Sequence, residues 1–265
     1  MITPRPHLPF PTIRSGLPLS APLDWIRAGM DDLRACRGAS LFYGACFALG
    51  GIIVVLTLRN AVQLVSGLIT GTLLIGPLFA IGLYELSRQR ERNEKPALRP
   101  SLVAWREPLS AVAVYSFIVI IIYLVWARAG LIVFALFYDG GMPTLSSLFT
   151  MLLRFDNPSF LIAYFLVGGF FAALVFSVSV VSIPLMLDRD QDAITSMIAS
   201  FLALARNPLV LLFWGFLISL LIGFGILLGY LGLILTGPLV GHATWHAFRA
   251  LIVPVEVTGI GEAND

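Results

Sequence analysis

Charged residues are scarce in this chain of 265 residues, where Asp, Glu, Lys and Arg together make up 12% of the positions. The formal net charge is only +2, and the charges stand in short clusters between apolar stretches. A nucleic-acid-binding surface needs basic residues gathered on one face. This distribution therefore argues against a nucleic-acid partner.

Cysteine and histidine are also rare. The chain has two cysteines, Cys36 and Cys46, and three histidines, His7, His242 and His246. Two cysteines at this spacing form neither a disulfide framework nor a zinc-finger pattern, so we expect both to pack as small apolar residues.

The motifs of common enzyme classes are missing. The sequence contains no phosphate-binding loop, dinucleotide fingerprint, nucleophile elbow or zincin motif. We therefore expect no catalytic residue, no dedicated cofactor site and no enzymatic activity.

Long apolar runs dominate what is present, since 58% of the residues are hydrophobic. A helix needs roughly 20 residues to cross the hydrocarbon core of a bilayer. Six runs reach about that length, which predicts an all-α, polytopic membrane protein. The predicted spans cover residues 39–58, 61–87, 109–127, 159–187, 209–228 and 231–248.

The basic residues predict one orientation. With the N-terminus in the cytoplasm, only Arg59, Arg128 and Arg154 of the 17 Lys and Arg residues face outward. Positive residues near helix ends resist translocation, so both termini are expected in the cytoplasm of a bacterial inner membrane. Residues 1–21 then form a proline-rich tail, residues 22–250 the membrane domain and residues 251–265 a second tail.

Three short segments with an apolar face precede the predicted spans that start from the cytoplasm. We expect each to be an interfacial helix that leads into a hairpin of two spans. Their apolar residues are Trp25, Ile26, Met30 and Leu33; Leu102, Val103 and Trp105; and Ile194, Ile198, Phe201 and Leu202.

A Gly-Pro-Leu sequence recurs in two of the returning spans, at Gly76-Pro77 and at Gly237-Pro238, with a weaker copy around Pro184. This recurrence favours three helical hairpins related as internal repeats, with chance similarity among apolar segments as the alternative. A proline within a span bends the helix and frees a carbonyl group, which lipid cannot satisfy. We expect these prolines to face protein, either for packing or as a gate or ligand cleft.

His242 and His246 are the strongest chemical candidates. They are four residues apart and so share one helix face, which is the spacing of a metal site or a proton relay. Three roles are open: hydrogen bonding to the second span, metal or haem ligation, and proton handling. Glu85 is the polar partner that the second span offers at matching depth.

An alternating acidic string, Asp188, Asp190 and Asp192, follows the fourth span. A calcium loop needs more oxygen ligands in a defined pattern. We expect these residues to cap the helix that comes next.

Several of these segments resemble one bacterial family of integral membrane proteins, domain of unknown function 2189. The resemblance rests on the sequence from Ser182 to Asp190, on Ala205-Arg206-Asn207-Pro208, on Trp214, and on GHATWHAFR at residues 241–249. It extends over nearly all of the chain after the proline-rich tail. It implies a six-helix inner-membrane protein of proteobacterial type without an assigned activity.

Some members of that family are labelled as cytochrome c oxidase subunits. A haem–copper core requires more histidines at membrane depth than the two in this chain. The leading hypothesis is therefore a non-catalytic accessory or assembly component that contacts the lipid bilayer and other membrane protein subunits. The alternatives are a small-solute transporter or channel, and a haem or metal protein that uses His242 and His246.

Overall fold

The computed structural model describes residues 10–60, 79–137 and 157–253, and in these ranges the regular structure is helical apart from one isolated β-bridge. The first two helices are α1 (Ala21–Ala35) and α2 (Arg37–Asn60), and residues 79–91 are also helical. Next come the short α4 (Leu98–Ser101) and η2 (Ala104–Arg106), followed by α5 (Leu109–Phe137) and α7 (Pro158–Ser179). The chain continues through α8 (Ser182–Arg189), α9 (Ala193–Arg206), α10 (Pro208–Leu227) and α11 (Leu233–Leu251).

Four helical stretches are long and apolar enough to cross a membrane. They are Arg37–Thr57, Leu109–Phe137, Pro158–Arg189 and Pro208–Leu227, which agree with the first, third, fourth and fifth predicted spans. Most of the second predicted span, residues 61–87, lies outside the described residues. The sixth, residues 231–248, corresponds to α11, which is helical but not among the candidate spans because polar residues occupy its C-terminal half.

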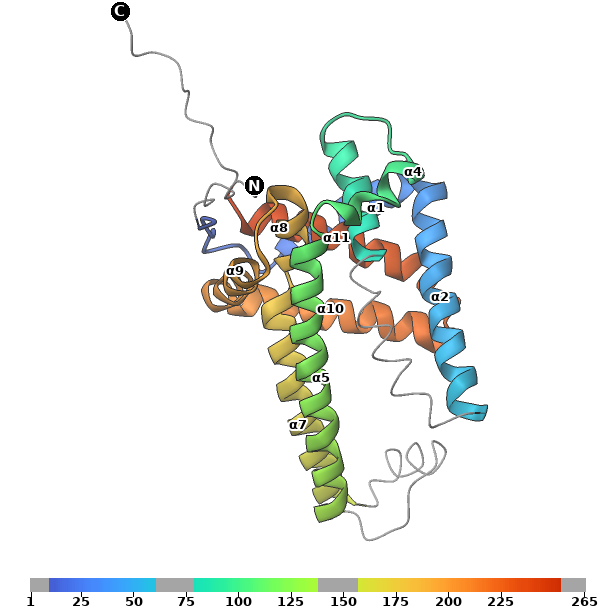
Figure 1. Ribbon diagram of the computed structural model, residues 1–265, viewed down its shortest axis with the longest axis vertical. Coiled ribbons are helices and arrows are strands. Elements are labelled where there is room, and N and C mark those ends of the chain that lie inside the picture. The colour runs from blue at the N-terminus through green and yellow to red at the C-terminus, as the bar shows by residue number, and fades with distance from the viewer. Residues whose placement is uncertain (1–9, 61–78, 138–156, 254–265) are drawn as a thin grey trace, which may run out of the picture.

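The helices do not form a bundle with one common axis. α5 and α7 make an antiparallel pair that extends away from the rest of the molecule, whereas α10 and α11 run crosswise to that pair (Figure 1). α10 and α11 pack against each other across a tight turn in which Gly229 and Tyr230 both have a positive φ. α1 and α2 both pack on α11, which makes α11 the enclosed centre of this half of the molecule.

The predicted three-hairpin arrangement is therefore only partly visible. α5 contacts α7 and α10 contacts α11, but the returning arm of the first pair begins in residues 61–78, outside the described part. Gly76 and Pro77, the first copy of the Gly-Pro-Leu sequence, lie in the same range outside the described residues.

The fourth predicted span is broken in two. α7 ends at Ser179 and α8 starts at Ser182, two residues before the buried Pro184, whose missing N–H cannot bond the carbonyl one turn earlier. Hydroxyl groups compensate for the break. Ser182 Oγ donates to the Val178 carbonyl at 2.5 Å, and Ser200 Oγ of α9 donates to the Ser177 carbonyl at 2.8 Å.

Pro238 lies inside α11 and is buried against protein. Its ring removes the donor that would bond the Ile234 carbonyl one turn before it. Gly44 of α2 approaches that carbonyl so closely that an added Cβ would lie 2.1 Å from the oxygen. Gly237, the residue before the proline, is less constrained, because a Cβ there would lie 3.1 Å from Phe47.

The segments that precede α2 and α10 are helices, as the sequence predicts, whereas the segment before α5 contains only α4 and η2, with Leu102 and Val103 in a turn between them. Asp192 caps the N-terminus of α9, where its carboxylate accepts the Thr195 N–H at 2.9 Å, and this confirms the capping role expected for one residue of the acidic string. α9 buries Met197 and small residues such as Ser196 and Ala199, whereas Ile194, Ile198 and Phe201 are exposed. Such an arrangement suits a helix whose outer face meets lipid.

Residues 10–18, in the proline-rich segment, form no helix and pack on the rest of the chain. Ile13 forms an antiparallel bridge with Ile252 after α11, and Arg14 N–H donates to the Leu251 carbonyl at 2.8 Å. Asn207, between α9 and α10, donates to the Arg14 carbonyl at 2.8 Å. The two ends of the described chain therefore lie side by side.

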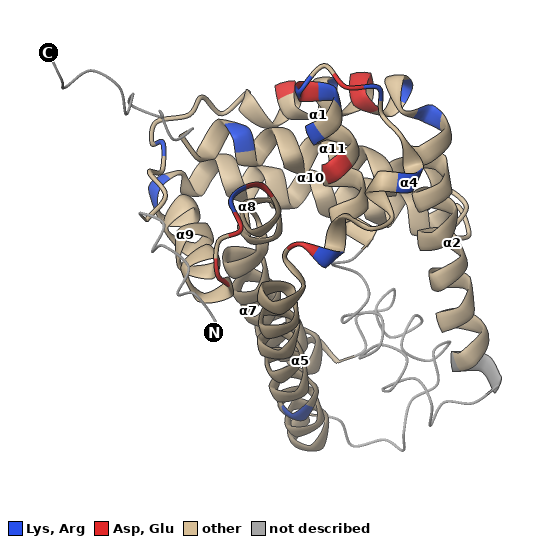
Figure 2. Ribbon diagram, turned by 45° about the horizontal axis from the view of Figure 1, so that its top comes forward, with Lys and Arg blue, Asp and Glu red and all other residues tan. Residues whose placement is uncertain are grey.

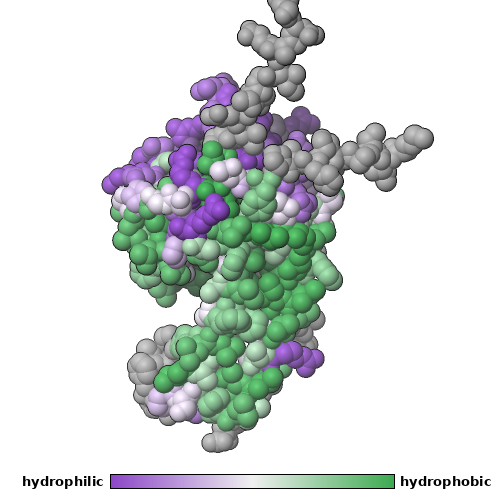
Figure 3. All heavy atoms as spheres, turned by 90° about the vertical axis from the view of Figure 1, so that its left-hand side faces the viewer, coloured by the Kyte–Doolittle hydropathy of each residue, from purple (hydrophilic) through white to green (hydrophobic). Residues whose placement is uncertain are grey.

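Charge is distributed unevenly over this architecture. Lys, Arg, Asp and Glu gather at one end, around α1, α8, the C-terminal part of α11 and the segment that contains α4, whereas α5 and α7 are nearly free of them (Figure 2). The same division appears on the molecular surface, with hydrophilic atoms at one end and apolar atoms over most of the remainder (Figure 3). We call this region the charged end.

Candidate functional site

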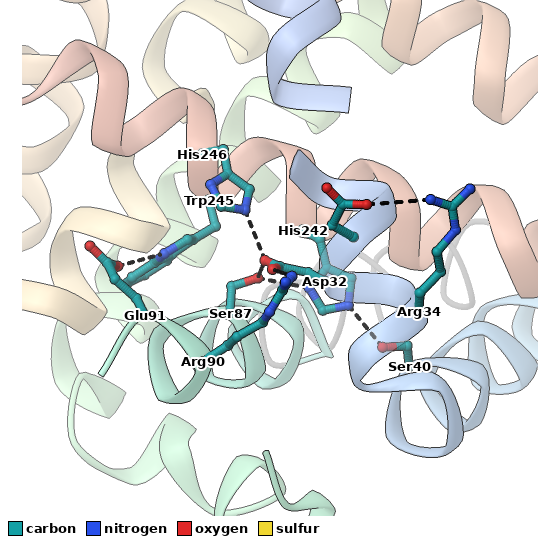
Figure 4. A network of polar contacts seen from close by, with 10 residues as sticks. Asp32, Arg34, Ser40, Ser87, Arg90, Glu91, His242, Trp245 and His246 are labelled. Carbon is teal, nitrogen blue, oxygen red and sulfur yellow. Dashed lines mark hydrogen bonds and ion pairs between the residues drawn. The ribbon is translucent and has the colours of Figure 1, made fainter. Parts of the chain in front are cut away.

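A buried polar network lies at the charged end, where four elements meet (Figure 4). α1 supplies Asp32, α2 supplies Ser40, the helical residues 79–91 supply Ser87 and Arg90, and α11 supplies His242 and His246. Asp32, Ser40, Ser87 and His242 are each at most 3% exposed. We call these six residues the Asp32 network.

The carboxylate of Asp32 is the acceptor at the centre of the network. Ser87 Oγ donates to Asp32 Oδ2 at 2.6 Å, and His246 Nε2 lies 2.8 Å from the same oxygen. Arg90 forms an ion pair with Asp32 Oδ1. A buried carboxylate is stable only when it is paired and hydrogen-bonded, and these three partners meet that need.

These contacts determine the tautomer of His242. Ser87 gives its only hydrogen to Asp32, so it accepts from His242 Nδ1–H at 2.8 Å. A neutral imidazole then has Nε2 as its acceptor, and Ser40 O–H donates to it at 2.8 Å. The hydrogen bonds therefore run in one direction, from Ser40 through His242 and Ser87 to Asp32.

Both titratable groups at the centre of the network have shifted pKa values. Burial acts to raise the pKa of Asp32, but hydrogen bonds from His246 and Ser87 and the nearby histidine charges hold it below its ordinary value of 3.8. His242 lies in α11, outside the four candidate spans, and burial lowers its pKa to about 4 despite the opposing charge of Asp32. Near neutral pH the network thus contains an ionised carboxylate beside a neutral imidazole.

A second cluster links α11 to α8 next to the Asp32 network. Arg249 binds both carboxylate oxygens of Asp188, at 2.7 and 2.8 Å, and also contacts Glu91 at 2.9 Å. Its guanidinium lies 4.7 Å from the centre of the Trp245 ring, and the Trp245 N–H donates to Glu91 at 3.1 Å. A bidentate pair with a stacked ring is a rigid connection, so this cluster fixes the orientation of α8 on α11.

Glu85 has a different partner from the one that the sequence suggested. It pairs with Arg88 at 2.6 Å within the helical residues 79–91, and both side chains are about nine-tenths buried. Arg88 also donates to the Leu187 carbonyl of α8 at 2.9 Å. Asp32, and not Glu85, is the hydrogen-bond partner of His246.

The structure brings His242 and His246 together with serine and carboxylate groups rather than with further ligands. Within the described residues, no group of three or more His, Cys, Asp or Glu side chains is arranged to hold a metal ion. Cys36 is buried, and burial raises its pKa to about 11, so its thiol keeps its proton and packs as an apolar group.

Asp32, Ser40 and Ser87 are the residues that sequence reasoning missed. Asp32 lies in an amphipathic helix directly after the exposed Asp31, and nothing local distinguishes the two carboxylates. Its partner His246 is 214 residues away in the chain. Only the packing of α1 on α11 reveals which of the two is buried.

The apolar spans and the charged end place this chain among integral membrane proteins, and a comparison with known families agrees. Residues 64–188 match the family Predicted integral membrane protein (DUF2189). The matched part includes α5, α7 and most of α8, and it ends before residues 205–208, Trp214 and the 241–249 segment. No curated protein and no solved structure matches the chain.

Proposed function

We propose that this protein is a non-catalytic accessory or assembly component of a complex in the bacterial inner membrane. One observation carries the proposal. His242 and Asp32, the side chains best suited to chemistry, are hydrogen-bonded within the protein and stabilise its fold. Both ring nitrogens of His242 are bonded to serines of α2 and of the helical residues 79–91. The carboxylate of Asp32 is bonded to side chains of residues 79–91 and of α11.

The surface supports the same proposal. The exposed side chains on α5, α7 and α10 are mostly large and apolar; they include Phe117, Leu136, Leu166, Phe170, Leu209 and Phe216, all more than 60% exposed. Lipid accepts such side chains, and so does the apolar face of another membrane protein.

We further propose that the charged end faces the cytoplasm, together with both termini. Its support is the charge distribution along the chain, because the segment from Arg88 to Arg106 is rich in arginine and arginine near a span resists translocation.

Affinity purification of the full chain in a mild detergent, followed by mass spectrometry, tests the proposed role. We expect the same membrane protein partners to be recovered in repeated preparations, and we expect the H242A/H246A double variant to lose them only if it also loses its fold. Recovery of the protein as a lone species would count against an accessory role. A haem absorption band or a stoichiometric metal in the purified protein would instead favour the haem or metal alternative.

A second candidate, a small-solute transporter, has one observation in its favour. The candidate span Pro158–Arg189 is broken at Val180 and Val181, and the Ser200 hydroxyl of α9 bonds the interrupted backbone. Broken spans line the substrate path in several transporter folds. Uptake of labelled solutes into proteoliposomes would distinguish this candidate, because an accessory component has no transport activity.

A further inference from the structure

The segment between the helical residues 79–91 and α5 presents unpaired positive charge at the charged end. We call residues 92–106 the basic loop. Four of its side chains are exposed and form no ion pair with any residue that the structure describes: Arg92, Lys95, Arg99 and Arg106. Glu94 is its one acidic residue, so the loop carries a net charge of +3, which is +4 from the basic residues and −1 from Glu94.

The same loop exposes apolar side chains next to these charges. Leu102 and Val103 are 40% and 45% exposed. Trp105 is half-buried, and its indole N–H donates to the Leu102 carbonyl at 2.9 Å. Apolar and tryptophan side chains beside arginines are typical of the boundary between lipid tails and headgroups.

Internal contacts hold the basic loop in place. The Ala97 N–H donates to the Gln89 side chain at 2.9 Å, and the Ser101 hydroxyl bonds Tyr43 of α2 at 3.0 Å. Leu98 packs on the cluster that contains Tyr43 and Leu86. The inward side of α4 is thus fixed, which leaves Arg99 pointing outward from a rigid support.

The position of the basic loop in the chain indicates which ligand it binds. α5, a candidate span, begins at Leu109, three residues after Arg106, so the loop lies at the membrane surface that α5 enters. We propose that the basic loop binds the phosphate headgroups of anionic phospholipids in that leaflet, while Leu102 and Val103 contact the upper parts of the acyl chains. The proposal does not depend on the accessory role, because any activity in the membrane could use such a surface.

Titration of a short-chain phosphatidylglycerol into the full chain, held in a neutral detergent and followed by native mass spectrometry, tests the proposal. The K95Q/R99Q variant removes two positive charges from the basic loop. R27Q/R34Q is the matched control, because it removes two exposed charges from α1 that are already paired with Asp24 and Asp31. Each basic residue near a lipid surface contributes about fivefold in affinity, so we expect K95Q/R99Q to bind phosphatidylglycerol about 30-fold more weakly than the wild type.

The control variant should bind phosphatidylglycerol within about twofold of the wild type, because the paired charges of α1 contribute little. The titration is repeated with phosphatidylcholine and with inorganic phosphate as competitors. Neither should displace phosphatidylglycerol from the protein. Equal binding by K95Q/R99Q and the wild type would overturn the proposal. So would equal binding of the anionic and zwitterionic lipids, or competition by inorganic phosphate alone.

Discussion

At the scale of single residues, the buried carboxylate of Asp32 is the acceptor that orients its neighbours. Donors from Ser87, His246 and Arg90 converge on its carboxylate, and Ser87 in turn orients His242. Removing the charge would leave these donors with a weaker acceptor in a buried site, and an incompletely satisfied polar network is costly.

The D32N variant should therefore be less stable than the wild type by about 2–4 kcal/mol, because a partly buried charge pair, one buried hydrogen bond and one partly buried hydrogen bond are weakened. Its matched control is D31N, whose side chain is 60% exposed and which, among the described residues, forms an ion pair with Arg34 alone. The control should change the free energy of unfolding by less than about 0.5 kcal/mol, since exposed pairs contribute little. Thermal unfolding in detergent, followed by helical circular dichroism, measures both. Equal midpoints for D32N and D31N would show that the network is not structural.

Acidification should also destabilise the protein through His242. Its pKa is about 4 in the folded protein against 6.5 in an unfolded chain, so both states are neutral above pH 6.5. Below that pH the unfolded state binds the proton first, and stability is lost as the pH falls from 6.5 towards 4, by an amount on the order of 3 kcal/mol. Asp32 adds to the loss below its ordinary value of 3.8, because its folded pKa is also lowered.

The unfolding midpoint recorded at intervals between pH 7 and pH 4 measures this dependence. The H242Q variant should be less stable than the wild type at pH 7 and should show a smaller slope across this range, since it cannot titrate. A wild-type unfolding midpoint that does not change with pH would contradict the assignment of this dependence to His242. So would an H242Q variant whose midpoint changes with pH as much as that of the wild type.

At the scale of elements, close backbone contacts hold α11 against its neighbours. Gly44 of α2 lies against the Ile234 carbonyl that Pro238 leaves without a helical donor. An alanine at this position would place its Cβ 2.1 Å from the carbonyl oxygen, and backbone cannot move aside as a flexible side chain does.

We expect G44A to lower the free energy of unfolding by about 1–3 kcal/mol or more through overpacking. G50A, in the same helix, has no atom of the described residues within 4 Å of its added Cβ, so it should be neutral or up to about 1 kcal/mol stabilising. Thermal unfolding of the two variants under identical conditions separates packing from helix propensity. A G44A protein as stable as G50A would mean that α2 does not pack on α11 as described.

Individual elements differ in how far the sequence predicted them. The four candidate spans follow from apolar runs, and the cap at Asp192 follows from a local pattern, because each is determined by nearby residues. The break before Pro184 depends on the Ser200 hydroxyl of α9, and the burial of Asp32 depends on contacts with α11. Contacts between distant segments leave no local pattern, which is why the histidines could be selected from the sequence but their partners could not.

At the scale of the whole molecule, charge is concentrated at one end and the candidate spans are apolar. The Asp32 network lies within that end and joins α1, α2, α11 and the helical residues 79–91 (Figure 4). The Arg249 cluster joins α11 to α8 and to the same residues 79–91. Hydropathy indicated that helices cross a membrane, but it carried no information on the crosswise placement of α10 and α11, which depends on how their faces pack.

Labelling of single cysteines from each side of the membrane tests the central claim, that the charged end is the cytoplasmic end of an integral membrane protein. In a chain with Cys36 and Cys46 replaced by alanine, K95C reports on the basic loop and R128C on the far part of α5. We predict that a membrane-impermeant maleimide added to intact cells labels R128C but labels K95C only after the inner membrane is opened. Labelling of K95C in intact cells, or labelling of both positions from the same side, would contradict the account.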